Sequence, residues 1–507
     1  MTTEADFWAD LRRERFLVVG FSERTGMHAG RLFARMGVPF AVSDSASMEV
    51  LAPRVEALRI ERRSEDGNGP PPFANEVERR ERFGRGGLRE AKAGGGHRAA
   101  ISKRSLGVPD VFAGPQTSAQ LDGITAVLLS PGVPRSIPLL VEARARGIPI
   151  WSDYDLLHPI YAHKRVAAIT GTDGKTTTTM LVAHMLREDA RVVVAGNMGT
   201  PITALYDEIR ACDALVLELS SFMLEEVRRF HAGVSTVLNV AEDHVDRYAS
   251  LDEYEATKRA ILKHARRPDV FVQNLDDPKI AGWPVDHVDV RAVSSRGAAP
   301  RDAAGRGCDA WFEDGRLHVG GASIDADRLR IRGIHHRSNA LVAASMAVAL
   351  GVDPEAALER ATTFPGVPHR FEHVGRAGGV DLVDDSKATS VHAVQRALES
   401  LADRRVVLIL GGRDKMLDPT PLGRVTGPLR AVVGYGEAGP RLLKAFPEGG
   451  PALAYVERFA DAVERACRLT EPGDVLLLSP ACTSFDQHTD YAERGAEFRE
   501  VARRTLG

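Results

Sequence analysis

The sequence predicts an α/β fold divided into three domains, because of its length, its composition and the alternation of apolar runs with helical segments. The chain has 507 residues, and one domain typically takes about 100–200. Hydrophobic residues make up 44% and charged residues 27%, as in globular proteins with substantial cores. Strand-like runs separated by helical segments predict mostly parallel sheets covered by helices.

The first domain is expected over residues 1–162 and begins with a β-α-β unit. The strand RFLVVG at 15–20 precedes a turn, a helix over about 27–36 and the strand FAVSD at 40–44. A buried strand in ITAVLLSPGVP, at 124–134, ends in a Pro/Gly turn. These elements predict one parallel sheet.

Residues 61–120 interrupt this domain. Their runs SEDGNGPPP, RRERFGRGG and KAGGG are rich in Arg and Gly and lack apolar periodicity. We expect an irregular insertion that is disordered or loosely packed. A second interpretation is a reading-frame artefact, since GC-rich DNA in a wrong frame encodes Gly, Ala, Arg and Pro. Peptide mapping of the native protein decides between the two.

The second domain is expected over 163–366 and the third over 367–507. The second has the strands VVVAG (192–196), ALVLELS (214–220), VSTVLNV (234–240) and VFVQN (270–274). A helix over 339–350 ends at Gly351, a typical C-cap residue. The third has the strands DLVDD (381–385), VVLILGG (406–412), AVVGYG (431–436) and VLLLSPA (475–481).

A glycine-rich loop opens the second domain after the apolar strand VAAIT. The order strand, glycine-rich loop, Lys-Thr and helix is typical of a phosphate cradle, where backbone N–H groups and the helix N-terminus attract negative charge. Lys175 is expected on the β/γ-phosphates and the Thr176 hydroxyl on Mg²⁺. The standard motif has a glycine six residues before the lysine, where this chain has Ile169. The loop residues are Gly171, Thr172, Asp173, Gly174, Lys175, Thr176, Thr177 and Thr178.

Bulk properties exclude several other classes of protein. The formal net charge of −3 gives no reason to expect a nucleic acid partner. Four scattered cysteines without a CxxC pair favour a reducing compartment, the cytoplasm. No signal peptide and no apolar run of about 18 residues are found, so we expect no membrane span. A monomer is expected.

Ten motifs in a fixed order resemble those of the Mur ligase and folylpolyglutamate synthase superfamily. They are GTDGKTT (171–177), AGNMG (195–199), LELSSF (217–222), LNVAEDHVDRY (238–248), EYEATK (253–258), GIHHRSN (333–339), VPHRFE (367–372), DDSKATS (384–390), LGGRDK (410–415) and SPACTSFDQ (479–487). Four of them, LELSSF, EDHVDRY, PHRFE and DSKAT, look like the branch of the family that adds D-glutamate. The resemblance covers the chain outside 61–120.

The resemblance implies an ATP-dependent ligase with a Rossmann-like UDP-binding domain, a central P-loop-type ATPase domain and a Rossmann-like C-terminal domain. It would join D-glutamate to UDP-N-acetylmuramoyl-L-alanine in the cytoplasmic part of peptidoglycan precursor synthesis. ATP phosphorylates the substrate carboxylate, and the amino group of glutamate then attacks the acyl phosphate. Cations must stabilise the charge that develops.

The resemblance also assigns a metal site and a catalytic set. Glu218, His244 and Lys258 would join Thr176 around two Mg²⁺ ions, with Lys258 as a carbamate. A lysine in a helix is otherwise an exposed cation, and a loop histidine is more often a hydrogen-bonding residue than a Mg²⁺ ligand. The implied catalytic residues are Lys175, Glu218, His244, Lys258 and His369.

Binding residues follow from the matching motif positions. Asn339, Arg370 and Asp385 would bind ATP, and this chain has His336 where the family often has Asn. The expected UDP-substrate residues are Ser22, Arg24, Thr25, Asp44, Ser45, Ser130, Gly132 and Asn197. The expected glutamate residues are Lys387, Thr389, Lys415, Ser484 and Phe485.

Three alternatives stay open at this point. The first is a sister amino-acid ligase of the same family or a folate-polyglutamating ligase, although a complete UDP-type block precedes the ATP loop. The second is a ligase for L-glutamate, because the pocket residues do not determine chirality. The third is a P-loop binding or regulatory protein without ligase activity, which would not need the positions of Glu218, His244 and Lys258.

Overall fold

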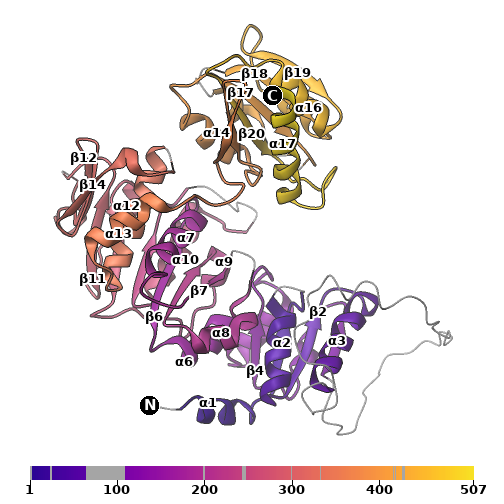
Figure 1. The fold of residues 1–507 in the computed structure, drawn as a ribbon. Coiled ribbons are helices and arrows are strands. Elements are labelled where there is room, and N and C mark those ends of the chain that lie inside the picture. The colour runs from indigo at the N-terminus through magenta and orange to yellow at the C-terminus, as the bar shows by residue number, and fades with distance from the viewer. Residues whose placement is uncertain are drawn as a thin grey trace, which may run out of the picture. The chain divides into compact units, whose positions relative to one another are not determined.

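The computed structural model describes residues 3–22, 25–63, 109–197, 200–241, 247–298, 300–331, 333–414, 416, 418–424 and 429–507. They form three sheets, which confirm the predicted α/β fold class (Figure 1). Two compact units are distinguished, one of Met1–Lys175, Asp189–Val272 and Val285–Val290 and one of Thr176–Glu188, Gln273–Pro284 and Arg291–Gly507. No helix within the described ranges is long and apolar enough to cross a membrane.

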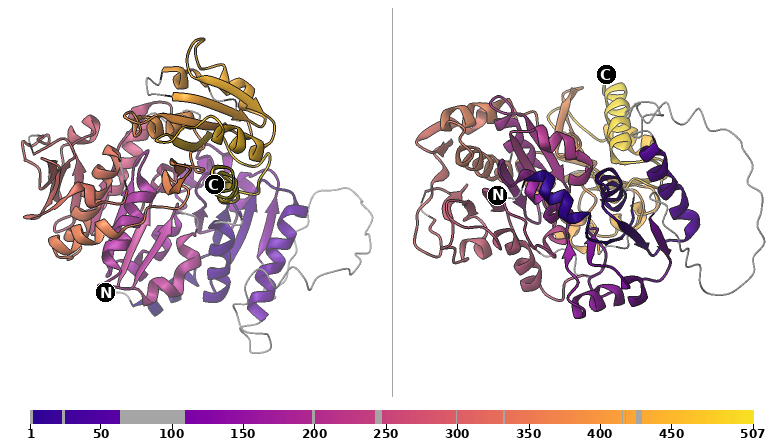
Figure 2. Two further views of the ribbon diagram at one scale, coloured as in Figure 1. Left: turned by 45° about the horizontal axis from the view of Figure 1, so that its top comes forward. Right: turned by 90° about the horizontal axis from the view of Figure 1, so that it is seen from below.

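The N-terminal sheet has five parallel strands in the order β3-β2-β1-β4-β5. Its elements are α1 (Glu4–Leu11), β1 (Phe16–Val19), α2 (Thr25–Met36), β2 (Phe40–Asp44), α3 (Met48–Arg63), β3 (Asp110–Ala113), β4 (Ala126–Leu129), α5 (Pro138–Ala145), β5 (Ile150–Trp151) and α6 (Asp153–Tyr161). Successive side chains of β1 point to opposite faces of the sheet. Leu17 lies in a core with residues of α5, and Phe16 packs against Phe33 of α2. Helices α2 and α3 pack side by side (Figure 2).

Regular structure is found within the range predicted to be irregular. Helix α3 extends to Arg63, and β3 pairs in parallel with β2 inside the range given for the insertion. The prediction for about 61–120 is therefore wrong for the strand at 110–113, and 64–108 lie outside the described residues. Strand β3 was missed because it is a four-residue edge strand that is only half-buried, so its apolar signal is weak.

The central sheet has nine strands in the order β14-β13-β12-β11-β10-β9-β6-β8-β7. Its strands are β6 (Arg165–Thr170), β7 (Val192–Gly196), β8 (Ala214–Glu218), β9 (Val234–Val237), β10 (Val270–Asn274), β11 (Asp289–Ser294), β12 (Ala310–Glu313), β13 (Arg316–Val319) and β14 (Ala322–Asp325). Its helices are α7 (Lys175–Leu186), α8 (Tyr206–Ala211), α9 (Ser221–Leu224), α10 (Leu251–Arg259), α11 (Pro278–Ala281), α12 (Ile334–Ala349) and α13 (Pro354–Thr363). Strands β7, β8, β6 and β9 pair in parallel, so their carboxyl ends share an edge. The antiparallel strands β12 to β14 were not predicted.

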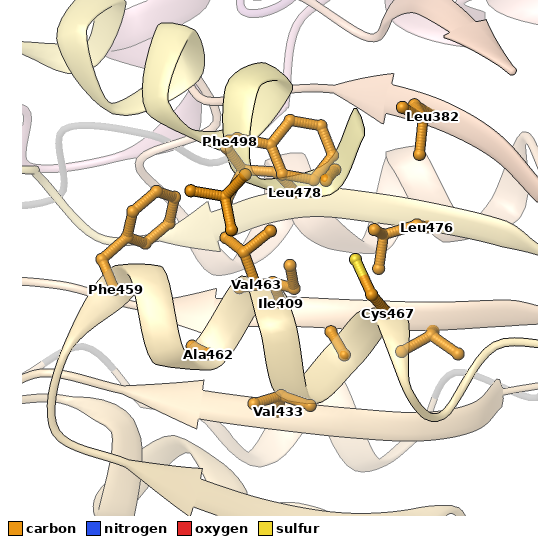
Figure 3. Close-up of a cluster of buried hydrophobic side chains, with 14 of the residues drawn as sticks. Leu382, Ile409, Val433, Phe459, Ala462, Val463, Cys467, Leu476, Leu478 and Phe498 are labelled. Atoms are coloured by element: carbon orange, nitrogen blue, oxygen red, sulfur yellow. The ribbon is translucent and has the colours of Figure 1, made fainter. Parts of the chain in front are cut away.

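The C-terminal sheet has six strands in the order β15-β16-β20-β17-β18-β19. Its elements are β15 (Glu372–Ala377), β16 (Val380–Asp384), α14 (Val391–Glu399), β17 (Val406–Gly411), β18 (Leu429–Tyr435), α15 (Gly439–Leu443), β19 (Ala452–Val456), α16 (Phe459–Cys467), β20 (Val475–Ala481) and α17 (Tyr491–Leu506). Along β17, Ile409 faces a core with Phe459 of α16 and Phe498 of α17 (Figure 3), whereas Leu408 faces a core with Val394 of α14. Helices therefore cover both faces of this sheet.

Helix α6 begins with a buried carboxyl group that should make stability depend on pH. Asp153 is 2% exposed, and burial, aided by repulsion from Asp155, raises the pKa of Asp153 to about 7. The folded state then binds an extra proton between the unfolded pKa near 3.8 and about pH 7, so stability falls as the pH rises through this range. Above pH 7 the free energy of unfolding stays lower by a constant amount, up to roughly 4 kcal/mol.

The variant Asp153→Asn keeps the shape but does not titrate. We expect it to unfold at a higher temperature than the wild type at pH 8, with the difference shrinking towards pH 4. Thermal unfolding followed by circular dichroism at several pH values measures this gap. A gap that does not change with pH would contradict the prediction.

Candidate functional site

The predicted nucleotide loop lies between β6 and α7, which begins at Lys175. Gly174 has a φ of +79°, in the region that favours glycine. A Cβ at Gly171 would lie 3.0 Å from the Cβ of Leu238, so the loop packs tightly against the segment that follows β9. Thr176, Thr177 and Thr178 are all buried in the first turn of α7. The loop therefore has the expected strand–loop–helix geometry.

Asn239 holds the loop in place and was missed by the sequence analysis. Its Oδ1 accepts hydrogen bonds from the backbone N–H groups of Thr172 (3.0 Å) and Asp173 (2.8 Å). Its Nδ2 donates to the carbonyl of Asp173 at 3.1 Å. The signal that could have revealed it is its place, two residues past the end of a buried parallel strand.

Two lysines converge on one carbonyl oxygen of the loop. Lys175 Nζ donates to the carbonyls of Gly171 (2.8 Å) and Thr172 (2.7 Å). Lys258 of α10, only 1% exposed, also donates from Nζ to the Gly171 carbonyl at 2.9 Å. A lysine is rarely so deeply buried without a functional or structural reason. The structure thus brings two of the predicted catalytic residues together.

Glu218 ends β8 at the same edge of the sheet, opposite Ile169 of β6. It is 1% exposed, and its Oε1 accepts a hydrogen bond from Asn197 Nδ2 at 2.8 Å. A Cβ at Gly196 would lie 2.1 Å from the Glu218 carbonyl oxygen, so only glycine allows this approach. Asn197, expected at the UDP-substrate, contacts the predicted metal ligand. It can orient that carboxylate, as residues that hydrogen-bond metal ligands do.

Three predicted residues, Arg24, His244 and Lys415, lie outside the described residues. Within the described part of the chain, one group of three side chains has ligand atoms close enough together to hold a metal ion. It consists of His369, Glu372 and Asp384. The guanidinium of Arg499 already bonds Glu372 (2.5 Å) and Asp384 (2.9 Å). This group is therefore an ion-pair cluster rather than a metal centre.

The segment around His369 is fixed by that cluster. His369 has a φ of +61°, and its Nδ1 lies 2.8 Å from Asp384 Oδ2. Its backbone N–H donates to Glu372 Oε2 at 2.8 Å. A Cβ at Gly495 would lie 2.2 Å from His369 Nδ1, so helix α17 closes over the ring. His369 is thus held by its own domain.

Of three more predicted nucleotide residues, Asp385 and Asn339 are buried and Arg370 is partly buried. Asp385 accepts hydrogen bonds from the Phe371 N–H (3.0 Å) and Ser479 Oγ (2.9 Å), and burial raises its pKa to about 7. The Nε of Arg370 is buried and has no hydrogen-bond partner among the described residues. Asn339 is 8% exposed on α12. Burial lowers the pKa of its neighbour His336 to about 3, so that imidazole is neutral.

Residues predicted to bind a UDP group gather at the carboxyl edge of the N-terminal sheet. Ser130 Oγ donates to the Gly20 carbonyl at 2.6 Å, and a Cβ at Gly20 would lie 2.7 Å from Val133. The turn after β1 therefore touches the loop after β4. Asp44 ends β2, and Ser22, Thr25 and Ser45 follow the neighbouring strands β1 and β2. A Cβ at Gly132 would have nothing within 4 Å.

Predicted glutamate residues follow three neighbouring parallel strands, β16, β20 and β17. Lys387 comes after β16, and its Nζ lies 4.9 Å from the ring centroid of Tyr491, a second residue that the motifs did not reveal. Ser484 after β20 is buried, Phe485 is 60% exposed, and Thr389 is half-buried.

The comparisons with known proteins agree along the chain. A family model for the Mur ligase middle domain matches residues 169–347, and one for the Mur ligase glutamate ligase domain matches 369–482. A UDP-N-acetylmuramoylalanine–D-glutamate ligase of Anaeromyxobacter dehalogenans (strain 2CP-C) is 37% identical over 414 residues, 77% of this chain and 86% of the relative. A relative of the same name from Rubrobacter xylanophilus is 39% identical over 418 residues, 82% of this chain and 91% of the relative.

Among solved structures, a UDP-N-acetylmuramate-alanine ligase from Thermotoga maritima matches with a TM-score of 0.53. It shares 18% sequence identity, and the match covers 97% of this chain and 100% of that chain. At this identity the likeness concerns the fold, which has the same succession of α/β domains.

Proposed function

The chain belongs to the Mur ligase family, and from this premise we propose that it adds D-glutamate to UDP-N-acetylmuramoyl-L-alanine at the expense of ATP. The observation that supports this most directly is the convergence of Lys175, Lys258 and Glu218 at the carboxyl edge of one parallel sheet. A P-loop protein that only binds a nucleotide can use one acidic residue beside the loop for Mg²⁺, but it has no need for a second, buried lysine there. The reaction belongs to the assembly of peptidoglycan precursors, and we place the enzyme in the cytoplasm as a monomer.

ATP binding is proposed at residues 171–178. Asn239 occupies the N–H groups of Thr172 and Asp173, which leaves the amides later in the loop and in the first turn of α7 for the phosphates. Lys175 would release its own loop carbonyls and turn to the β/γ-phosphates. Asn339 would contact the adenine, and Asp385 would contact the ribose. Arg370, which is partly buried, would contact the phosphates. His369 would position Arg370 from within its ion-pair cluster.

Mg²⁺ would be held by Thr176, Glu218, His244 and Lys258, the last as a carbamate, and would neutralise the charge on the phosphoryl oxygens. The described residues fit this role. Glu218 is buried and already oriented by Asn197. The two ammonium groups at the Gly171 carbonyl repel each other, and carbamylation of Lys258 removes that repulsion. A lysine carbamate keeps one N–H, so the hydrogen bond from Lys258 to Gly171 can persist.

The two other substrates are assigned to the outer domains. We propose that the turn at Ser22–Thr25, with Arg24, and the loops at Asp44–Ser45 and Ser130–Gly132 bind the UDP part of the substrate. Lys387 and Lys415 would hold the carboxylates of glutamate, because ammonium–carboxylate pairs are strong directional contacts. Thr389, Ser484 and Phe485 would complete that pocket.

A single assay tests this function. We expect ADP and phosphate release when ATP and Mg²⁺ are combined with UDP-N-acetylmuramoyl-L-alanine and D-glutamate, and not with L-glutamate. Two control reactions use the substrates of related ligases, UDP-N-acetylmuramate with L-alanine and a folate with glutamate. Neither pair should release ADP and phosphate. Release with L-glutamate alone, or with neither enantiomer, would overturn the proposal.

A further inference from the structure

A buried ion pair anchors the loop that we assign to the UDP-substrate. Arg247 donates from one terminal nitrogen to the Gly132 carbonyl (3.2 Å) and from the other to the Val133 carbonyl (3.1 Å). Its Nε and a terminal nitrogen also donate to the two oxygens of Glu225, at 2.7 and 2.6 Å. One side chain thus ties the loop after β4 to the end of α9. These residues line a common pocket with Ser130 and Phe222.

The guanidinium of Arg247 is held by Glu225 and by the ring of Phe222 as well as by the two carbonyls. The Glu225 side chain is only 4% exposed and also accepts a hydrogen bond from the Tyr248 hydroxyl at 2.8 Å. The Phe222 ring centroid lies 4.7 Å from the central carbon of the guanidinium. A bidentate, partly buried pair of this kind is much more rigid than an exposed one.

The hydrogen-bond inventory of Arg247 indicates how it acts. Arginine has five N–H donors, and four of them are used by Glu225, Gly132 and Val133. Its charge is matched by the Glu225 carboxylate. A group whose donors and charge are already used is suited to hold the loop and poorly suited to bind a phosphate itself.

We propose that Arg247 is a positioning residue that holds the Ser130–Val133 loop in the conformation that binds the UDP-substrate, with Glu225 and Tyr248 holding Arg247. The inference rests on the proposed function, which assigns this loop to the UDP part. Val133 and Ser130 of this loop lie beside the turn at Gly20, with Val133 2.7 Å from the position of a Cβ at Gly20. Loosening the Gly132 and Val133 carbonyls would therefore disorder one wall of the substrate site and leave the ATP loop unchanged.

The test uses two variants that separate positioning from direct contact. Arg247→Ala removes the anchor, and Glu225→Gln keeps the arginine and its charge but weakens its attachment. We expect the Kd for UDP-N-acetylmuramoyl-L-alanine, measured by calorimetry, to rise about tenfold or more in both, which corresponds to about 1.4 kcal/mol. KM for ATP and for D-glutamate should change less than about twofold, and methylguanidine should partly restore binding to Arg247→Ala.

Arg135→Ala is the matched control, because Arg135 pairs with Glu226 at 3.0 Å nearby but is 48% exposed. It should bind the substrate like the wild type. If Glu225→Gln binds normally while Arg247→Ala does not, Arg247 is a direct ligand and the positioning role is refuted. If both variants bind normally, the inference fails altogether. A wild-type protein that does not bind this substrate would instead refute the proposed function.

Discussion

Replacing Lys258 with alanine is expected to reduce ligase turnover by a factor on the order of 10²–10³, as when one preorganised electrostatic group is removed from an active site. Lys258 is 1% exposed, and its Nζ donates to the Gly171 carbonyl inside the nucleotide loop. As a carbamate it would supply the anionic oxygen that Mg²⁺ prefers. Alanine removes both the ligand and the contact with the loop. Steady-state release of phosphate measures the loss.

Chemical rescue distinguishes the carbamate from a purely structural lysine. Formate or acetate can occupy the cavity left by the side chain and supply a carboxylate, so each should restore part of the activity of Lys258→Ala. A structural ammonium would not be replaced by an anion. Lys263→Ala is the control, because Lys263 lies one turn beyond α10 and donates to the Val227 carbonyl at 2.7 Å, away from the loop. Full activity of Lys258→Ala without added acid would refute the assignment.

The buried strands could be predicted closely from the sequence. Val475–Ala481 has the predicted ends, because a buried, mostly apolar run bounded by polar residues is typical of a central strand of a parallel sheet. The strands at 310–325 could not be predicted in the same way. Each has four residues, with exposed positions and tight turns between them, so neither an apolar run nor a long alternation marks them.

Some residues of the candidate site could also be predicted from the sequence, and others could not. Glu218 and Lys387 could be predicted from the family motifs. Their places after apolar strands supported these assignments, because strand ends of a parallel sheet meet at one edge. Asn239 and Arg247 could not be predicted, because their roles depend on partners 67 and 115 positions away in the chain. A polar side chain whose role is to hydrogen-bond a distant polar group follows no periodic pattern in the sequence. Such residues become visible only when the fold brings their partners together.

The loops of the proposed glutamate site should collapse when Arg494 is replaced by methionine. Arg494 of α17 is fully buried and donates to Ser386 Oγ (3.0 Å) and the Ser386 carbonyl (2.7 Å), in the loop before Lys387. It also donates to the Cys482 carbonyl (3.1 Å), before Ser484, and to the Tyr435 hydroxyl (3.1 Å). One guanidinium thus joins the loops after β16 and β20 to the end of β18.

Methionine has a similar length but no donors, so Arg494→Met leaves two carbonyls and two hydroxyls buried without these donors. Breaking a buried charged network of this kind costs about 3–5 kcal/mol, which would lower the unfolding midpoint of the C-terminal domain by roughly 10 °C. Where the variant still folds, KM for D-glutamate should rise more than KM for ATP, because the loops with Lys387 and Ser484 lose their common support. Differential scanning calorimetry and steady-state kinetics measure the two effects.

Arg503→Met is the matched control for Arg494→Met. Arg503 lies on the same helix, is exposed, and donates to the carbonyl of Val374 at 2.6 Å. Its loss should shift the midpoint by a few degrees at most, because it removes a single hydrogen bond made by a side chain that is already exposed to water. Arg494→Lys retains the charge with three donors in place of five and should fall between wild type and Arg494→Met. Equal midpoints for the two methionine variants would show that the loops after β16 and β20 are held by their own packing and not by the buried guanidinium.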